Sequence, residues 1–358
     1  MSENSIRLVF TGDLLPADRQ HTLGIGVGSR ITKSSNLWSS KLKRLFVSSD
    51  ITVVNLEAPL LNEPQKQIKK YFAGRREILP HLVNSGITHV HIANNHILEH
   101  EKKYWHNTIS LLREKGIEPV GVKERNTSNI IVKDIQGLTV ALAGFNAIHD
   151  IANPGCYAEL TEENALTALK HPKMQKADFR VLMFHWGNEY IHIPSWEQRQ
   201  LARKCIDAGA RIIIGHHPHV IQPVEEYNGG LICYSLGNFL FDMLWSKSVR
   251  TGLIMGINIE ANNSFSWEVH PCRYDKTLQV QLLKDLWAQK RLKKWQHKMN
   301  ALAAKGEQAY KKAYTRELKI NRFLARLQMK RQLLMQLPRI SASERKHIVS
   351  SIFRKLIR

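Results

Sequence analysis

Short apolar runs alternate with amphipathic stretches over the first three quarters of the chain. Buried strands are predicted where branched aliphatic residues cluster, at residues 6–10, 51–54, 86–92, 118–122, 138–145, 179–184, 211–214 and 231–235. Helices are predicted between them, at residues 39–47, 101–115, 161–170 and 198–208. Residues 252–259 and 264–269 predict an antiparallel pair of strands. This alternation is typical of a layered α/β domain whose two faces are covered by helices.

The pattern changes near the carboxyl end. From Leu278 onward the apolar residues fall at helical spacing, until Pro338 ends the array. Ser341 and Glu344 stand at capping-box spacing and predict one last helix.

Charge separates the same two regions. The chain of 358 residues has a net charge of +21, yet residues 276–358 alone hold 22 Lys and Arg against 4 Asp and Glu. We therefore predict an α/β domain over residues 1–275 and a basic α-helical region over residues 276–358.

Composition narrows the class of protein. No run of 18 apolar residues occurs, and the first residues lack a basic and apolar leader, so we expect no transmembrane segment. The four cysteines are far apart and are expected to be buried, reduced thiols. A cytoplasmic protein is predicted, with possible peripheral contact at the inner face of the membrane through its basic region.

Polar side chains that can bind a metal ion follow several of the predicted strands. Asp13, Glu57, Asn95, His185, His217 and His219 come from five separate strand ends, with His217 and His219 after the same strand. In an open α/β sheet the carboxyl ends of strands converge on a crevice, so these side chains are expected to meet there. Taken singly, each is as well explained by a cap or a turn. As a set without a thiolate, they favour one or two divalent ions such as Mn, Fe, Zn or Mg.

The ordered motifs allow a family resemblance to be stated. The chain carries Gly12-Asp13, Asn55-Leu56-Glu57, Ala93-Asn94-Asn95-His96, His185-Trp186-Gly187-x-Glu189-Tyr190, His217-Pro218-His219-Val220 with Gln222 and Glu225, and Ser235-Leu236-Gly237-Asn238-Phe239. Together, over roughly residues 5–272, these motifs resemble the CapA family of poly-gamma-glutamate capsule biosynthesis proteins, which are similar to calcineurin-type metallophosphoesterases. The resemblance implies a four-layer αββα metallophosphoesterase-like sandwich, followed here by the basic helical appendage.

The resemblance also implies roles for individual residues. It implies metal ligands at Asp13, Glu57 (bridging), Asn95, His185, His217 and His219. It implies catalytic roles for Asp13 and for His96, the latter as the acid that protonates the leaving group. Substrate binding is expected at Asn55, Asn94, Trp186, Glu189 and Asn238. One departure is visible: in metallophosphoesterases the first motif resembles D-x-H, whereas Leu14 and Leu15 follow Asp13 here. The missing histidine favours a single metal ion or a weakened second metal site.

Two hypotheses for function remain. The first is a metal-dependent hydrolase of CapA type, phosphoesterase-like, acting on a phosphorylated glycan or anionic polymer during capsule or polysaccharide biosynthesis. The second is a non-catalytic accessory protein that binds an anionic polymer or a membrane-bound synthase through its basic helices. For those helices, simple packing with solvated charges, docking on an anionic membrane and binding of a polyanion are all open. Nucleic acid is disfavoured as a partner, because the basic region has no recognisable nucleic-acid motif.

Overall fold

Two stacked β-sheets form the centre of the protein in a computed structural model that describes residues 5–61, 71–124, 127–149 and 155–336. The first sheet has eight strands in the described part of the chain, in the order β18-β17-β16-β1-β2-β5-β6, with β15 also paired to β1. Its strands are β1 (Ile6–Leu14), β2 (Ile51–Leu56), β5 (His89–His91), β6 (Glu118–Val120), β15 (Asn238–Leu240), β16 (Thr251–Ile259), β17 (Phe265–Tyr274) and β18 (Val280–Leu282). Strands β1, β2, β5 and β6 run parallel, and the predicted antiparallel pair β16–β17 is confirmed.

The second sheet has six described strands in the order β13-β14-β12-β11-β10-β9. They are β9 (Ile131–Ile135), β10 (Leu138–Asn146), β11 (Phe179–His185), β12 (Ile212–His216), β13 (Val224–Tyr227) and β14 (Gly230–Cys233). The four central strands are parallel and the two edge strands are antiparallel. Two small ribbons, β3 (Leu60–Leu61) with β4 (Gly74–Arg75) and β7 (Lys123–Glu124) with β8 (Thr127–Ser128), lie outside both sheets.

Three apolar layers hold the sheets and helices together. Between the sheets, Leu8 and Phe10 of β1 meet Met183 of β11 and Ile214 of β12. Because side chains alternate along a strand, the intervening Val9 faces the opposite way and packs against helices. The same alternation on β11 turns Leu182 and Phe184 to the outer face of the second sheet.

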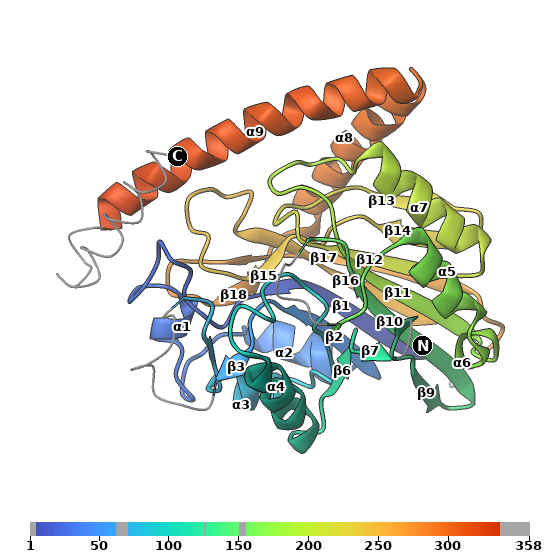
Figure 1. The fold of residues 1–358 in the computed structure, drawn as a ribbon, viewed down its shortest axis with the longest axis horizontal. Helices are drawn as coiled ribbons and strands as arrows, with labels where there is room; N and C mark the ends of the chain where they lie inside the picture. Colours follow the sequence, from blue (N-terminus) through green and yellow to red (C-terminus); the bar gives the residue numbers. More distant parts are fainter. Residues whose placement is uncertain (1–4, 62–70, 125–126, 150–154, 337–358) are drawn as a thin grey trace.

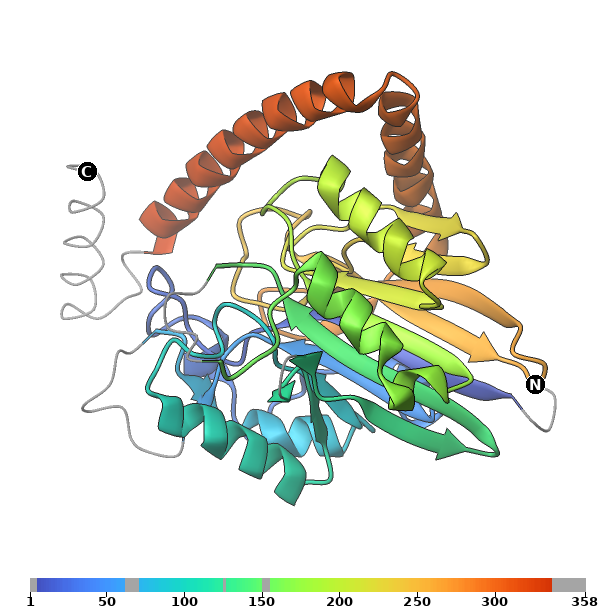
Figure 2. The same ribbon diagram turned by 45° about the vertical axis from the view of Figure 1, so that its right-hand side comes forward.

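Helices cover both outer faces. The first sheet is covered by α2 (Ser40–Val47), α3 (Ile78–Val83) and α4 (Lys102–Glu114), and the second by α5 (Glu162–Lys170), α6 (Pro172–Gln175) and α7 (Trp196–Asp207). A single turn, α1 (Val27–Arg30), lies in the loop after β1. Figure 1 and Figure 2 show α5 and α7 on one side of the stacked sheets and α2 and α4 on the other. The four-layer αββα sandwich is therefore confirmed.

The predicted helices begin and end close to where capping residues stand. Ser39 accepts a hydrogen bond from the Leu42 amide at the start of α2, and Thr161 does the same for Asn164 at the start of α5. Ser195 and Gln198 form a reciprocal capping box at α7, which therefore starts at Trp196 rather than at residue 198.

Three predicted elements differ from the structure. Strand β1 does not end at Phe10: it continues to Leu14, because β15 and β2 pair with it on either side. Strand β5 covers only His89–His91 of the predicted residues 86–92. The helical spacing read from Leu278 onward is wrong for its first residues, since Val280–Leu282 pairs with β17 as strand β18.

Two long helices follow that strand. They are α8 (Asp285–Ala303) and α9 (Glu307–Gln336), and α9 crosses the top of the molecule in Figure 1. Met299, Tyr310 and Tyr314 pack into the apolar layer outside the second sheet, so these helices are joined to the sandwich. The division at residues 275 and 276 stays a prediction, and the helix predicted from Ser341 lies outside the described residues. Within the described residues, no helix is both long and apolar enough to cross a lipid bilayer.

Candidate metal centre

Strand register brings polar side chains into two facing rows. In the first sheet, Asp13 pairs with Asn238 of β15 on one side and with Asn55 of β2 on the other. In the second sheet, His185 of β11 pairs with His216 of β12. These positions are the carboxyl ends of parallel strands, where the apolar filling between the sheets stops and a crevice opens.

An irregularity in β1 allows Asp13 to reach that crevice. The pairing of β1 with β2 shifts register between Phe10 and Asp13. The residue before Asp13 must be glycine, since a Cβ on Gly12 would lie 1.9 Å from the Gly237 carbonyl oxygen. The Asp13 amide in turn donates a hydrogen bond of 2.9 Å to that carbonyl. This close approach fixes the aspartate backbone between two neighbouring strands.

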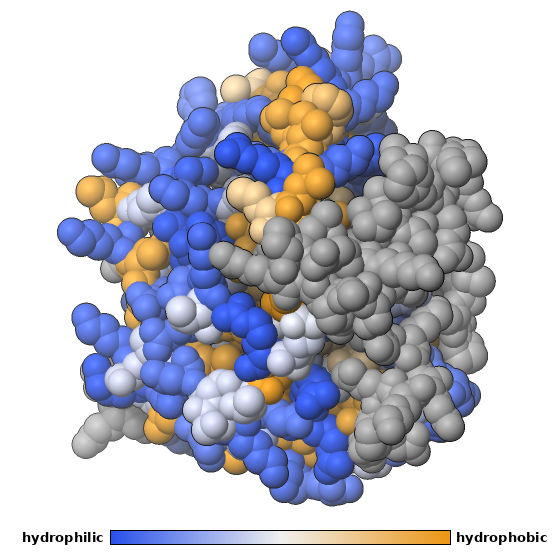
Figure 3. Space-filling model, turned by 90° about the vertical axis from the view of Figure 1, so that its left-hand side faces the viewer, coloured by the Kyte–Doolittle hydropathy of each residue, from blue (hydrophilic) through white to orange (hydrophobic). Residues whose placement is uncertain are grey.

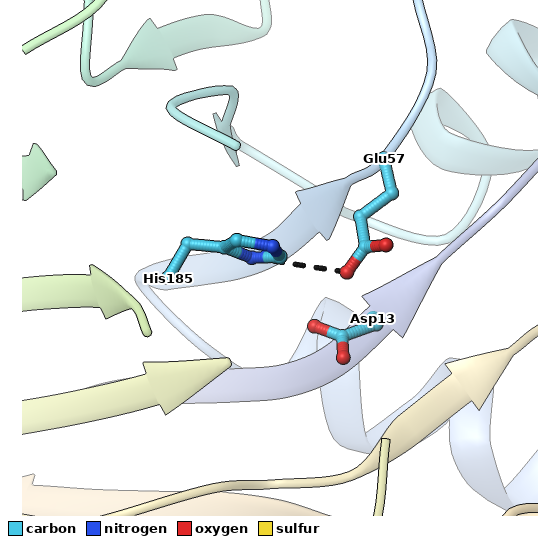
Figure 4. Close-up of side chains that lie close together, drawn as sticks. All are labelled: Asp13, Glu57 and His185. Atoms are coloured by element: carbon cyan, nitrogen blue, oxygen red, sulfur yellow. Dashed lines mark ion pairs between the residues drawn. The ribbon is translucent and has the colours of Figure 1, made fainter. Parts of the chain in front are cut away.

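Asp13, Glu57 and His185 form the centre of the site. All three side chains are buried, and one ligand atom of each lies within 4.8 Å of those of the other two. Figure 4 shows the two carboxylates and the imidazole pointing toward one another from different strands. The ring Nδ1 of His185 lies 3.8 Å from Glu57 Oε1. Two carboxylates and an imidazole at this spacing are a donor set for a divalent ion.

Asn55 stands among these donors. Its Nδ2 lies 2.9 Å from Asp13 Oδ1, 3.2 Å from Glu57 Oε1 and 3.3 Å from His185 Nδ1. An amide nitrogen carries two hydrogens, so it cannot satisfy three acceptors at once. The surplus of acceptors around this point indicates that the site lacks positive charge.

The two carboxylates have opposite electrostatic environments. Burial raises the pKa of Glu57 well above its ordinary value, and the negative charge of Asp13 adds to that rise. Burial also acts to raise the pKa of Asp13, but hydrogen bonds from His216 and His219 outweigh it and hold this pKa well below its ordinary value. Asp13 is therefore ionised, whereas Glu57 resists ionisation until a cation arrives.

The predicted ligands His185 and Asn95 contact each other. His185 Nε2 lies 2.9 Å from Asn95 Oδ1, and because an amide oxygen only accepts, Nε2 carries the proton. That tautomer leaves the lone pair of Nδ1 directed toward Glu57 and Asp13. Burial lowers the pKa of His185 well below its ordinary value, which keeps the ring neutral and able to bind a metal.

His217 and His219 reach the site from the loop after β12. Their φ angles are +94° and +56°, in the region that residues with a Cβ rarely adopt. Such backbone strain costs about 1–3 kcal/mol per residue and is concentrated at functional sites. The strained loop directs the His217 amide to Asp13 Oδ2 at 3.3 Å and His219 Nδ1 to the same oxygen at 3.2 Å.

The rings of these two histidines differ in their partners. The His217 ring lies edge-on to His185 with centroids 4.9 Å apart, its buried Nδ1 has no hydrogen-bond partner, and burial lowers its pKa to about 4. His219 Nδ1 donates to Asn238 Oδ1 at 2.9 Å as well as to Asp13. Burial acts to lower the pKa of His219, but Asp13 outweighs it and raises the pKa.

The residues present fit a divalent ion. Glu57 Oε2 and His217 Nδ1 are buried without a hydrogen-bond partner, and such orphaned atoms are costly unless something binds them. No Lys or Arg among the described residues forms an ion pair with Asp13 or Glu57. Two buried carboxylates without a Lys or Arg partner among the described residues are the electrostatic condition that a cation relieves.

His96, the predicted acid, lies beside this cluster. Its Nδ1 is 3.0 Å from Glu99 Oε1, its Nε2 is 3.2 Å from Asn95 Nδ2, and its ring stacks on Phe72 at 3.9 Å between centroids. The side chain is 18% exposed, so a substrate can reach it. Asn95 thus connects His96 to His185.

The predicted substrate-binding residues are mostly enclosed. Asn55, Asn94, Trp186 and Asn238 are all buried, and only Glu189 is partly exposed. Asn94 donates to the Leu56 carbonyl at 2.8 Å and accepts from the His96 amide at 3.2 Å. Asn238 joins His219 to the Val249 carbonyl. These amides hold the ligand-bearing segments in position and offer little surface to a substrate.

Among the residues predicted to bind substrate, Trp186 lies farthest from a position that could do so. Its side chain lies in the apolar layer outside the second sheet, and its indole N–H donates to the Tyr234 carbonyl at 3.0 Å. The reason is strand alternation: His185 faces the crevice, so the next residue faces the helices. Glu189 stays close to the histidines. Burial acts to raise its pKa, but His219 and His217 outweigh burial and lower the pKa.

Sequence reasoning did not select two buried histidines near the site. His216 Nδ1 lies 3.2 Å from Asp13 Oδ1, and the ring of His91 on β5 is 5.6 Å from that of His216. A Cβ on Gly144 would meet His91 Cδ2 at 2.5 Å, so this glycine makes room for the ring. The signal was present in the His89-Val-His91 alternation, which places two imidazoles on one face of a strand.

Comparison with known proteins places this geometry in context. The family described as bacterial capsule synthesis protein PGA_cap matches residues 7–243. The capsule biosynthesis protein CapA of Bacillus anthracis is 34% identical over 222 residues, which is 58% of this chain and 54% of that protein. The PGA biosynthesis protein CapA of Bacillus subtilis (strain 168) is 31% identical over 259 residues, covering 69% and 67% of the two chains. The chain thus spans about half the length of the first relative.

A solved structure, that of a 5'-nucleotidase precursor from Thermus thermophilus, is similar over 83% of this chain and 59% of that chain, with a TM-score of 0.44 and 13% identity. The family match covers more than half of the sequence, and every motif of the metal centre up to Asn238 lies within it. The chain belongs to the bacterial capsule synthesis protein family PGA_cap.

Proposed function

We propose that this chain is a metal-dependent hydrolase of CapA type, phosphoesterase-like, that acts in the biosynthesis of a capsule or another anionic polymer. The observation that carries the proposal is the buried cluster of Asp13, Glu57 and His185, in which acceptors outnumber donors and no Lys or Arg of the described residues pairs with either carboxylate. A structural cluster would be expected to satisfy its own polar atoms.

Asp13, Glu57 and His185 would hold the first ion, and Asn95, His217 and His219 are proposed as further ligands, of that ion or of a second. A divalent ion supplies Lewis acidity at the transferred group and neutralises charge that develops on its oxygens. The His219–Asn238 and His185–Asn95 hydrogen bonds orient the two rings, as partners of metal-bound histidines commonly do.

His96 is proposed as the group that gives a proton to the leaving oxygen. Glu99 accepts from its Nδ1, which orients the ring, while Nε2 lies on the side of Asn95. Stacking on Phe72 limits rotation of the ring. General acid catalysis by a positioned side chain contributes typically about 10²–10⁴-fold.

A cavity next to α9 supports the proposal of an anionic substrate. It has a volume of ≈ 640 Å³ and lies between α9 and the loop after β1, with Arg30, Lys276 and Arg331 among its lining residues and no carboxylate. Trp245 also lines it and lies 6.1 Å from Tyr190, whose ring is 6.5 Å from His219. A cavity with three cationic side chains and no carboxylate in its lining suits a phosphorylated glycan or a polyanionic chain.

The experiment measures metal content and hydrolysis of a generic phosphodiester with added Mn²⁺, for the wild type, Asp13→Asn and the surface control Asp207→Asn. We expect bound metal and activity in the wild type and the control, and at least about a hundredfold less activity with little metal in Asp13→Asn. Absence of metal from the wild type, with equal activity in all three proteins, would remove the hydrolase proposal.

The second candidate is an accessory protein that holds an anionic polymer. The charge of residues 276–358 favours it. Because Met299, Tyr310 and Tyr314 belong to an apolar core, removing the whole region would expose that core, and charge reversal on exposed residues is the better test. Salt-sensitive binding of polyglutamate that persists in Asp13→Asn and is lost in Lys319→Glu with Arg326→Glu would support this candidate.

A further inference from the structure

The second half of α9 exposes an unusual concentration of apolar side chains. Six of the ten large apolar side chains that are exposed in the described part of the chain belong to it: Ile320, Phe323, Leu324, Leu327, Leu334 and Met335, with exposed fractions from 47% to 68%. Isolated exposed apolar residues are normal on protein surfaces, but a cluster of this kind marks an interaction surface.

These residues share one side of the helix. Their spacing of three, four and seven positions matches the 3.6-residue repeat, so they form a continuous strip, which we call the α9 strip. Figure 3 shows apolar side chains gathered near the top of one side of the molecule and bordered by hydrophilic ones. Ala325 and Leu333, at other positions around the helix, are buried.

Positive charge flanks the strip along one side, at Lys319, Arg326 and Lys330. Residues 318–336 contain five basic residues, Lys319, Arg322, Arg326, Lys330 and Arg331, and no Asp or Glu. All five are exposed. The acidic residues of α9 lie earlier, where Glu317 pairs with Lys298 and Glu307 with Lys311.

The first half of α9 accounts for its attachment to the protein. Tyr310 and Tyr314 are buried, and Tyr310 donates a hydrogen bond to the Pro194 carbonyl at 2.9 Å. Asn188 holds both Tyr314 and Arg322, through bonds of 3.0 and 2.7 Å. These contacts fix the direction of the helix, so the α9 strip is presented from a rigid base.

We propose that the α9 strip docks on an anionic lipid surface, with its apolar side chains inserted at the boundary of headgroups and acyl chains and its basic residues on the headgroups. An apolar strip bordered by Lys and Arg is the pattern of a helix that lies in the plane of a membrane interface. No described helix can span a bilayer, which agrees with docking on one surface.

Charge complementarity favours lipid over a second copy of this chain. Two α9 strips facing each other would bring Lys319, Arg326 and Lys330 of one copy against the same cations of the other, and like charges at close range repel. An anionic leaflet instead attracts each of them, and every basic residue near such a surface strengthens binding by about fivefold.

The test is co-sedimentation of the full chain with vesicles of phosphatidylcholine, with and without phosphatidylglycerol. We expect binding to the anionic vesicles that weakens with salt, and at least about tenfold weaker binding for Phe323→Glu with Leu327→Glu. The matched control is Val47→Glu, since Val47 is an apolar residue of α2 that is 67% exposed and lies outside α9.

Insertion is measured separately from binding. All four native cysteines are buried, so Phe323→Cys and Val47→Cys can each be labelled with a polarity-sensitive fluorophore. Anionic vesicles should shift the emission at position 323 to the blue and leave position 47 unchanged.

Three results would overturn the inference. The first is equal binding by the wild type and the Phe323→Glu, Leu327→Glu variant, and the second is no blue shift at position 323. The third is light scattering that finds a dimeric wild type and a monomeric variant, which would assign the α9 strip to a second copy. None of these measurements depends on hydrolytic activity, so the inference and the proposed function can fail independently.

Discussion

Two buried glutamates of this protein have opposite environments. Glu225 on β13 accepts hydrogen bonds at Oε1 from Arg199 and Arg203, and at Oε2 from Arg199 and Tyr234. Glu57, at the candidate metal centre, accepts from the Asn55 amide at Oε1, and its Oε2 has no hydrogen-bond partner among the described residues. Burial acts to raise the pKa of Glu225, but hydrogen bonds from Arg199, Tyr234 and Arg203 outweigh burial and lower it, whereas the pKa of Glu57 is raised well above its ordinary value.

The contrast separates a structural carboxylate from a functional one. Around Glu225 the protein supplies all the positive charge that an ionised side chain needs, so the cluster is complete without a ligand. Around Glu57 it supplies amides and imidazoles, which can bind a cation but do not replace one. Burial alone would not have distinguished the two residues, because both are enclosed.

The largest effect is expected from Glu225→Ala. Removing the shared carboxylate leaves the buried guanidinium of Arg199 unpaired, which should lower the free energy of unfolding by about 3–5 kcal/mol. Urea denaturation measures the change. Glu226→Ala is the control: the neighbouring Glu226 is exposed and, in the part of the chain that the structure describes, accepts one hydrogen bond, from Trp267, so a similar loss there would contradict the distinction.

Metal should stabilise the protein more strongly as pH rises. The raised pKa of Glu57 means that ionising it is costly in the folded metal-free protein, so that protein loses stability as pH rises from the unfolded pKa of Glu toward the folded one. Mn²⁺ at a hundredfold its Kd at pH 6 should add about 2.7 kcal/mol to the free energy of unfolding at that pH. The same Mn²⁺ concentration should add more at pH 8, because binding should be tighter there. Thermal unfolding with Mn²⁺ and with EDTA measures this, and equal stabilisation at both pH values would count against Glu57 as a ligand.

The same substitution at the two glutamates should sharpen the comparison. In EDTA, Glu57→Gln should change the free energy of unfolding by less than about 1 kcal/mol, because a glutamine resembles the protonated side chain. Glu225→Gln should cost about 1.5–3 kcal/mol, since it weakens hydrogen bonds to charged groups. The Glu57 variant should also lose stabilisation by Mn²⁺. A larger loss at Glu57 than at Glu225 in EDTA would reverse the assignment of the two clusters.

The smallest effect is expected at an exposed ion pair. Lys204 and Glu162 lie 2.8 Å apart with both side chains about half exposed. Lys204→Ala should reduce stability by less than about 1 kcal/mol, because water screens the pair. Denaturation in low and high salt measures the change. A loss comparable to that of Glu225→Ala would show that the exposure of an ion pair does not determine how much it stabilises the protein.

Particular residues show how much of the fold could be predicted from the sequence. The compact apolar run from Ile6 to Phe10 was enough to predict β1, and the helical pattern from Ser39 to Val47 was enough to predict α2. The end of β1 was not predictable, because β15, which extends it, comes more than two hundred residues later. Val280–Leu282 likewise became a strand because β17 offered a free edge, although their spacing resembles that of the helix that follows.

The sequence by itself determined the donor residues of the metal centre and the strand ends that carry them, because chemistry and periodicity are local properties. Only the tertiary structure decided which donors are already satisfied. It placed three acceptors around the single amide nitrogen of Asn55, turned Trp186 into the core beside His185, and gave Glu225 two arginines while giving Glu57 none. The physical reason is that hydrogen bonding and burial depend on neighbours brought together by folding, and the charge that Glu57 lacks is visible only once those neighbours are in place.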